Sequence, residues 1–439
     1  MNLVYGVKDK PKFGQMLVFA FQQVLAILAA TIAVPSIIGN GMSQSAALFG
    51  AGIGTLVYQL FTKRNSPVFL GSSFAFIGSM FAAFGGAASA AAGYAGLIIG
   101  AAFAGLVYVV IALVVKKVGV NWINKLMPPV VIGPTVAIIG LSLAGNAVGD
   151  LTTGRVAGCS PYVALICGLV TLFAVIFFSV YGKKMAKLIP FILGILAGYV
   201  VATIFTVIGI ASGNAALQVI DFSVFANMGI VSLPDFTFVM AAKGLSDIDG
   251  AFIATVAVAY VPVAFVVFAE HIADHKNLST IIGSDLLVNP GLHCTLLGDG
   301  VGSFAGALFG GCPNTTYGES VGCVAITRNA SVVTITTAAV LCLLISFFDP
   351  FVTFLASIPN CVMGGVCITL YGFIAVSGLK MIQQVNLSAS KNLFVAAVIL
   401  ITGIGGLSLT FGKVTLTAIA CALILGILTN VMVSKAKED

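Results

Sequence analysis

The stretch Pro313-Asn-Thr-Thr-Tyr-Gly-Glu319 opens an apolar segment, residues 313–327, with residues that interrupt a helix. Proline and glycine break helices, and the run between them looks extended. A similar stretch, Pro67-Val-Phe-Leu-Gly-Ser-Ser73, opens the apolar segment 67–84. Non-helical backbone at membrane depth is tolerated only where it is buried in protein or lines a cavity. Each helical half then begins with free N–H groups at a positive dipole end, and two such ends facing each other predict a polar cradle.

The composition places these two stretches in a membrane protein. The chain has 439 residues, of which 59% are hydrophobic and only 8% charged. A soluble domain carries about 25% charged residues, so a soluble enzyme, a nucleic-acid-binding protein and a disordered protein are all excluded for the whole chain. The longest polar break, 212–246, is too short for a separate domain. Fourteen apolar segments are recognised, at 14–36, 45–61, 67–84, 92–115, 129–149, 160–180, 188–211, 250–273, 295–311, 313–327, 331–348, 358–378, 391–407 and 414–433.

The distribution of positive charge supports fourteen crossings. If the N-terminus is cytoplasmic, 17 of the 20 Lys and Arg residues fall on the cytoplasmic side, and only Arg155, Lys243 and Lys413 fall outside. Cytoplasmic loops carry an excess of Lys and Arg, and a wrong span count would scramble that excess. We therefore predict an all-α polytopic protein of the cell membrane with both termini in the cytoplasm.

A weak internal repeat relates the two halves of the chain. A shift of 248 residues places Gly50–Leu56 over Gly298–Phe304, and Gln22-Gln23 over Glu270-His271. The shift pairs spans 1 to 3 with spans 8 to 10. Seven spans per half is an odd number, so the halves would have opposite orientations. Inverted repeats of this kind are typical of secondary transporters, with the substrate between the halves.

Four acidic residues remain in, or at the edge of, the apolar segments: Glu270, Asp274, Asp299 and Glu319. An ionisable group at membrane depth costs several kcal/mol, so these residues are functional candidates. Asp274 follows Glu270 by one helical turn on the same face, where it would tune the proton affinity of Glu270. The alternative, that Asp274 is solvated at the cytoplasmic end of span 8 beside His275 and Lys276, stays open.

The residues from Gly310 to Arg328 (GGCPNTTYGESVGCVAITR) resemble the signature of the nucleobase–cation symporter-2 family, also called nucleobase–ascorbate transporters. Three other stretches agree with the family: Leu70–Ile77, Phe268–Ile272 and Asn289–His293. The resemblance runs from about Gln22 to the last span and is greatest to the bacterial uracil-transporting members.

The resemblance implies a fold and a mechanism. Fourteen spans would form two inverted seven-span repeats, with short strands breaking spans 3 and 10. A core domain, residues 1–117 and 247–349, would carry substrate, and a gate domain, residues 118–246 and 350–439, would support it. Family members are similar to elevator-type carriers and are often homodimers.

Site residues also follow from the resemblance. Glu270 and Glu319 match the two substrate-binding carboxylates, the backbone N–H groups of Phe74 and Gly318 match donors to the base, and Ala30 matches a small residue lining the pocket. A carboxylate is an acceptor-only group, which suits the N–H groups of uracil. No phosphate-binding loop, nucleophile–base pair or metal cluster is recognised, so we expect a transporter without cofactor rather than an enzyme.

Departures from the family pattern keep alternatives open. Gln23 stands where uracil-transporting members commonly have His, and Ser320 stands where Asn is usual. Asp274 replaces a His, and Asp274 and Asp299 both match acids found in purine-transporting members, so this polar network is partly purine-like. Glu319, rather than Gln, favours uracil over xanthine or another purine. An anion carrier of the same fold is the third alternative. Burial favours a protonated carboxyl group, so H⁺ is preferred over Na⁺ as the coupling ion.

Overall fold

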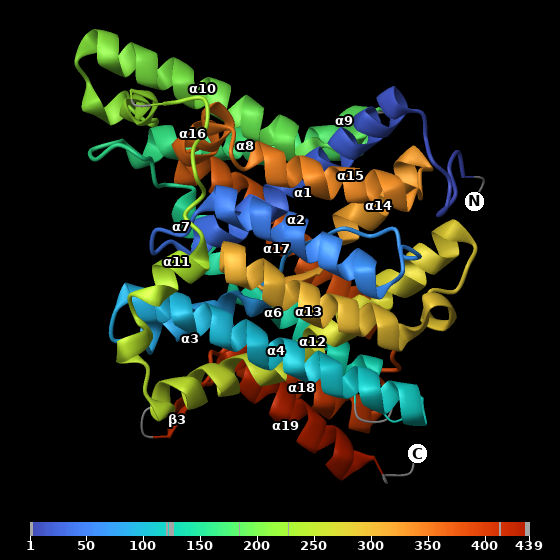
Figure 1. Ribbon diagram of the computed structural model, residues 1–439. Helices are drawn as coiled ribbons and strands as arrows, with labels where there is room; N and C mark the ends of the chain where they lie inside the picture. The colour runs from blue at the N-terminus through green and yellow to red at the C-terminus, as the bar shows by residue number, and fades with distance from the viewer. Residues whose placement is uncertain are drawn as a thin grey trace.

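The computed structural model describes residues 3–119, 122, 127–183, 185–226, 228–411 and 414–434. It is mostly helical, and the helices run side by side in one body (Figure 1). Among the described residues, seven helices are long and apolar enough to cross a membrane. Eleven of the predicted segments contain one main helix each: α1 (Phe13–Ile38), α2 (Gln44–Phe61), α4 (Ala90–Val118), α8 (Pro161–Tyr181), α10 (Pro190–Ser212), α12 (Gly250–Ile282), α13 (Leu292–Gly310), α15 (Val332–Ile345), α17 (Asn360–Ile382), α18 (Ser390–Ile404) and α19 (Ala418–Val433).

The fifth predicted segment is divided into α6 (Pro129–Ser142) and α7 (Ala144–Asp150). Shorter elements connect the long helices. They are α9 (Met185–Leu188), α11 (Thr237–Ala242), α16 (Asp349–Ser357), η2 (Ala215–Leu217), η3 (Phe222–Phe225), η4 (Leu245–Asp247) and η5 (Leu287–Gly291).

The two interrupted segments have the predicted form. Strand β1 (Leu70–Ser72) leads through the short helix η1 (Phe74–Phe76) into α3 (Ile77–Gly85), and β2 (Asn314–Thr316) leads into α14 (Gly318–Thr327). The strands pair antiparallel, with Gly71 opposite Thr315, and all six strand residues are buried. The interruptions at Pro67 and Pro313 therefore meet inside the protein and bring the beginnings of two half helices together.

Close packing around the strands explains why small residues surround them. The Asn314 side-chain amide donates to the Gly50 carbonyl at 3.0 Å, and a Cβ at Gly54 or Gly306 would collide with that amide. A Cβ at Gly71 would likewise collide with the ring of Tyr317. Small residues let backbones approach closely, so the glycines of α2 and α13 hold the strands between them.

Two elements differ from the sequence expectations. Helix α12 continues to Ile282, nine residues beyond the predicted end, so Asp274 and His275 lie within it rather than after it. The last predicted segment begins in a hairpin, in which β3 (Leu409–Phe411) pairs antiparallel with β4 (Val414–Leu416) before α19 starts. The alternating Thr and apolar residues of this hairpin resemble part of a span in the sequence, because a strand of this kind and a membrane helix are both apolar on average.

Candidate substrate-binding site

A cavity of about 410 Å³ lies where the two half helices begin. Its polar wall comes from η1, β2, α12 and α14, and its apolar wall from α6, α10 and α17. The polar wall contains Ser73, Phe74, Ala75, Glu270, Ala273, Asp274, Thr315, Thr316, Tyr317, Gly318 and Glu319. The apolar wall is formed mainly by Val136, Ile139, Phe191, Leu370, Phe373, Ile374 and Met381. Eight site residues were predicted from the sequence, and five of them line this one cavity: Phe74, Glu270, Asp274, Gly318 and Glu319.

The first residues of the half helices supply hydrogen-bond donors. Phe74 begins η1 and Gly318 begins α14, and both residues line the cavity. First-turn N–H groups have no acceptor within their own helix, and the helix dipole adds partial positive charge there. Two such ends beside one cavity suit the carbonyl oxygens of a small polar ligand.

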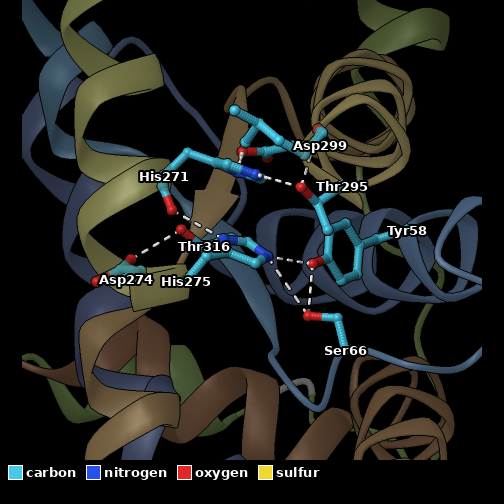
Figure 2. Close-up of polar contacts among 9 residues, drawn as sticks. Tyr58, Ser66, His271, Asp274, His275, Thr295, Asp299 and Thr316 are labelled. Atoms are coloured by element: carbon cyan, nitrogen blue, oxygen red, sulfur yellow. Dashed lines mark hydrogen bonds and ion pairs between the residues drawn. The ribbon is translucent and has the colours of Figure 1, made fainter. Parts of the chain in front are cut away.

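Three carboxylates line the same cavity. Glu270 and Asp274 come from successive turns of α12, and Glu319 lies in the first turn of α14. Asp274 accepts a hydrogen bond from the Thr316 hydroxyl at 2.7 Å, which ties α12 to β2 (Figure 2). Asp274 is therefore part of the cavity wall, and not a solvated residue beyond the end of the helix.

The remaining three predicted residues lie behind this wall. Gln23 of α1 is buried and donates to the Ser320 carbonyl at 3.3 Å, so it braces α14. Ala30 is buried in α1, and it is not among the described residues that line the cavity. Asp299 of α13 is fully buried and also lies outside the lining.

Asp299 joins α13 to α12 through a histidine that sequence reasoning did not single out. One oxygen of Asp299 lies 2.7 Å from Nδ1 of His271, and Nε2 of the same ring lies 3.0 Å from the Thr295 hydroxyl (Figure 2). All three side chains are fully buried. His271 directly follows Glu270, so this bridge fixes α12 at the level of the cavity.

A second histidine, His275, links α12 to the segment before β1. Its Nδ1 donates to the His271 carbonyl at 2.8 Å, and its Nε2 lies 2.7 Å from the Tyr58 hydroxyl. That hydroxyl also bonds to Ser66 at 2.7 Å, and the two histidine rings stack with centroids 4.0 Å apart (Figure 2). The spacing of four residues between the histidines places them on one face of a helix and was the available sequence signal.

Comparison with known proteins places this chain in a family. Residues 14–412 match the model of a family described as a permease family. Uracil permease from Bacillus caldolyticus is 40% identical over 98% of this chain and 94% of its own length. Uracil permease from Escherichia coli strain K12 is 32% identical over 96% of this chain and 92% of its own length.

Solved structures share the fold. The transmembrane domain of the cyanobacterial bicarbonate transporter BicA superposes with a TM-score of 0.65 at 18% identity, covering 97% of this chain and all of that domain. The murine anion transporter Slc26a9, in its inward-facing state, superposes with a TM-score of 0.66 at 12% identity, covering 97% of this chain and 69% of its own.

The family match and the relatives named permeases identify the chain as a membrane transporter rather than an enzyme. The chain belongs to the permease family that its signature indicates, the nucleobase–cation symporter-2 family.

Proposed function

We propose that this protein imports uracil together with a proton across the cell membrane. The observation that carries the proposal is one cavity lined by Glu270 and Glu319 and by Phe74 and Gly318, the first residues of η1 and α14. Uracil has N–H groups beside carbonyl oxygens, so carboxylates and backbone donors on one wall complement it. Two relatives that match this chain over nearly its full length are named uracil permeases, which supports the same substrate.

The transport cycle that we propose is of the elevator type. The core domain, residues 1–117 and 247–349, would carry the base past the gate domain, residues 118–246 and 350–439. The cavity has walls from both parts, with Glu270 on the first and Phe373 on the second. The two halves would be inverted repeats, both termini would be cytoplasmic, and two copies would associate through the gate domain.

Two other substrates follow from specific observations. Asp274 lines the cavity, and an acid at this position is a purine-like feature, so xanthine is the second candidate. The structural neighbours include a bicarbonate transporter and an anion transporter. However, the charged residues among the described lining are Glu270, Asp274 and Glu319, and three carboxylates disfavour an anion.

Counterflow with labelled uracil in proteoliposomes tests the proposal. Unlabelled uracil inside the vesicles should drive accumulation of label, and external unlabelled uracil should abolish it. Competition by xanthine at lower concentration than by uracil would assign a purine transporter. No accumulation of labelled uracil, together with counterflow of labelled bicarbonate in the same vesicles, would assign an anion carrier.

A further inference from the structure

A second cavity lies beside the proposed substrate pocket. Its volume is about 270 Å³. One wall comes from α3, with Ile77, Gly78 and Phe81, and a second from the end of α6 and the start of α7, with Ser142 and Asn146. The start of α19 completes the lining with Thr417, Ala418 and Ile419. The residues proposed to read the base, Glu270 and Glu319, do not line it.

Only a thin partition separates the two cavities. Phe74 and Ile139 line both of them, one from η1 and one from α6. The Phe74 ring meets Tyr371 of α17 edge-on, with centroids 6.0 Å apart, which holds the ring across the space between η1 and α17. The two cavities therefore share part of their wall.

The second cavity has the chemistry to hold a flat polar ring. Phe74 and Phe81 offer aromatic surface, on which a planar base can stack. The Asn146 amide carries both a donor and an acceptor, and this pair matches an N–H beside a carbonyl. Ligand sites in proteins are commonly mostly apolar, with a few polar groups that fix orientation.

We propose that this second cavity is a subsite for the same nucleobase, occupied before or after the pocket at Glu270, with Asn146 as its polar contact. The inference rests on the proposed function, since it takes uracil as the ligand. Phe74 then has two roles: its backbone faces the pocket, and its ring separates the pocket from the subsite. In the proposed orientation the ends of α3 and α7 face outward, so the subsite would be the first to meet external uracil.

Protection of an introduced thiol tests the subsite. Ser142→Cys, which leaves Asn146 in place, is made in the full-length chain and treated with a small maleimide, with uracil absent or present at ten times its dissociation constant for that site. Ser142 is exposed and lines the second cavity, so occupancy at that concentration should slow labelling about tenfold. Val148→Cys is the matched control, because Val148 of α7 is also exposed but lines a different cavity. The unsubstituted chain, in which Cys159 and Cys294 are half-buried, gives the background.

The same experiment in a Glu270→Gln background separates the two cavities. Protection at position 142 should persist there, because Glu270 does not line the second cavity. Loss of protection in that background would show that uracil acts only through the first pocket, which overturns the subsite. No protection in a chain that binds uracil by calorimetry would overturn the subsite and leave the proposed function intact. Absence of uracil binding by the unsubstituted chain would overturn both.

Discussion

Glu270 is the residue on which the proposed recognition of uracil most depends. The change Glu270→Gln keeps the size of the side chain but replaces one acceptor oxygen with a donor, which would face an N–H of the base. We expect uracil binding to weaken by ~1.5–3 kcal/mol, the worth of a hydrogen bond to a charged group. Calorimetry on the purified protein measures this directly. Asp285→Asn, at an exposed position after α12, is the control and should bind as the unsubstituted chain does. Unchanged affinity in Glu270→Gln would remove this residue from the site.

Asp274 is expected to set the pH dependence of uptake. It lies one turn from Glu270 and lines the same cavity, with Glu319 on the facing half helix. Carboxylates that share a site disfavour joint ionisation, so removing one charge lets the other release its proton at lower pH. Asp274→Asn should therefore shift the pH optimum of uracil uptake in vesicles downward and leave the preference between bases unchanged.

A matched variant distinguishes the effect of the Asp274 charge from the effect of the position of its side chain. Thr316→Val removes the hydroxyl that donates to Asp274 but leaves the carboxylate in place. It should change the affinity for uracil more than the pH profile. Superimposable profiles for the unsubstituted chain and Asp274→Asn would mean that the coupling proton must be sought at Glu270, Glu319 or Asp299 alone.

At the residue scale, the sequence revealed the acids but not their partners. An acid within an apolar run stands out because of its cost in the membrane, and this rule found Glu270, Asp274, Asp299 and Glu319. His271 and His275 did not stand out, because their partners are distant in the chain. Asp299 is 28 positions from His271, and Tyr58 is 217 positions from His275. Only the fold brings such pairs together.

At the scale of elements, β2 is closely packed against α2 and α13. A methyl group at Gly306 would collide with the Asn314 amide, which holds β2 by its bond to the Gly50 carbonyl. Gly306→Ala should therefore lower the stability of the protein by ~1–3 kcal/mol, as overpacking of a core does. Thermal unfolding in detergent should show a lower midpoint temperature.

The control for this prediction is Gly322→Ala in α14. A Cβ there meets nothing within 4 Å, and alanine favours a helix by about 1 kcal/mol over glycine. Its midpoint temperature should equal or exceed that of the unsubstituted chain. Equal loss of stability in both variants would show that glycine is needed for reasons other than the Asn314 contact.

The elements were predictable wherever proline and glycine mark a change of structure. Pro67, Pro313 and Gly318 indicated both interrupted segments, and the structure confirms them. The end of α12 was not predictable from hydropathy, because the helix continues through Lys276 after its apolar face ends. The bond that Asp274 accepts from Thr316 and the bond between His275 and Tyr58 stabilise that extension, and hydropathy does not report them.

At the scale of the whole molecule, helix length and composition together explain how fourteen apolar segments relate to seven long apolar helices. Helices α15, α18 and α19 have 14 to 16 residues, and α3 and α14 are half helices. Helices α2 and α13 are less apolar because both carry several glycines, α2 also carries two glutamines, and α13 also carries Asp299. About 20 residues cross a membrane, so shorter helices depend on their neighbours for the remaining depth. Charge along the chain therefore remains the better guide to the number of crossings.

The proton gradient is the expected energy source of the whole transport cycle. Symport requires a group that gains a proton when substrate binds on one side and releases it on the other. Glu270, Asp274 and Glu319 line one cavity, and closely spaced carboxylates favour a state in which at least one is protonated. An inward proton gradient should therefore drive uracil uptake into proteoliposomes, and an internal pH dye should report acidification that depends on uracil.

A sodium gradient at equal pH on both sides is the matched control for that experiment, and it should not drive uptake. Carboxylates also bind Na⁺, so the two ions share ligand chemistry, and only the gradient experiment separates them. Glu270→Gln should abolish the acidification as well as the uptake, since the proton and the base would meet at the same carboxylate. Uptake that follows sodium and leaves the internal pH unchanged would assign the same three carboxylates to a sodium-coupled carrier.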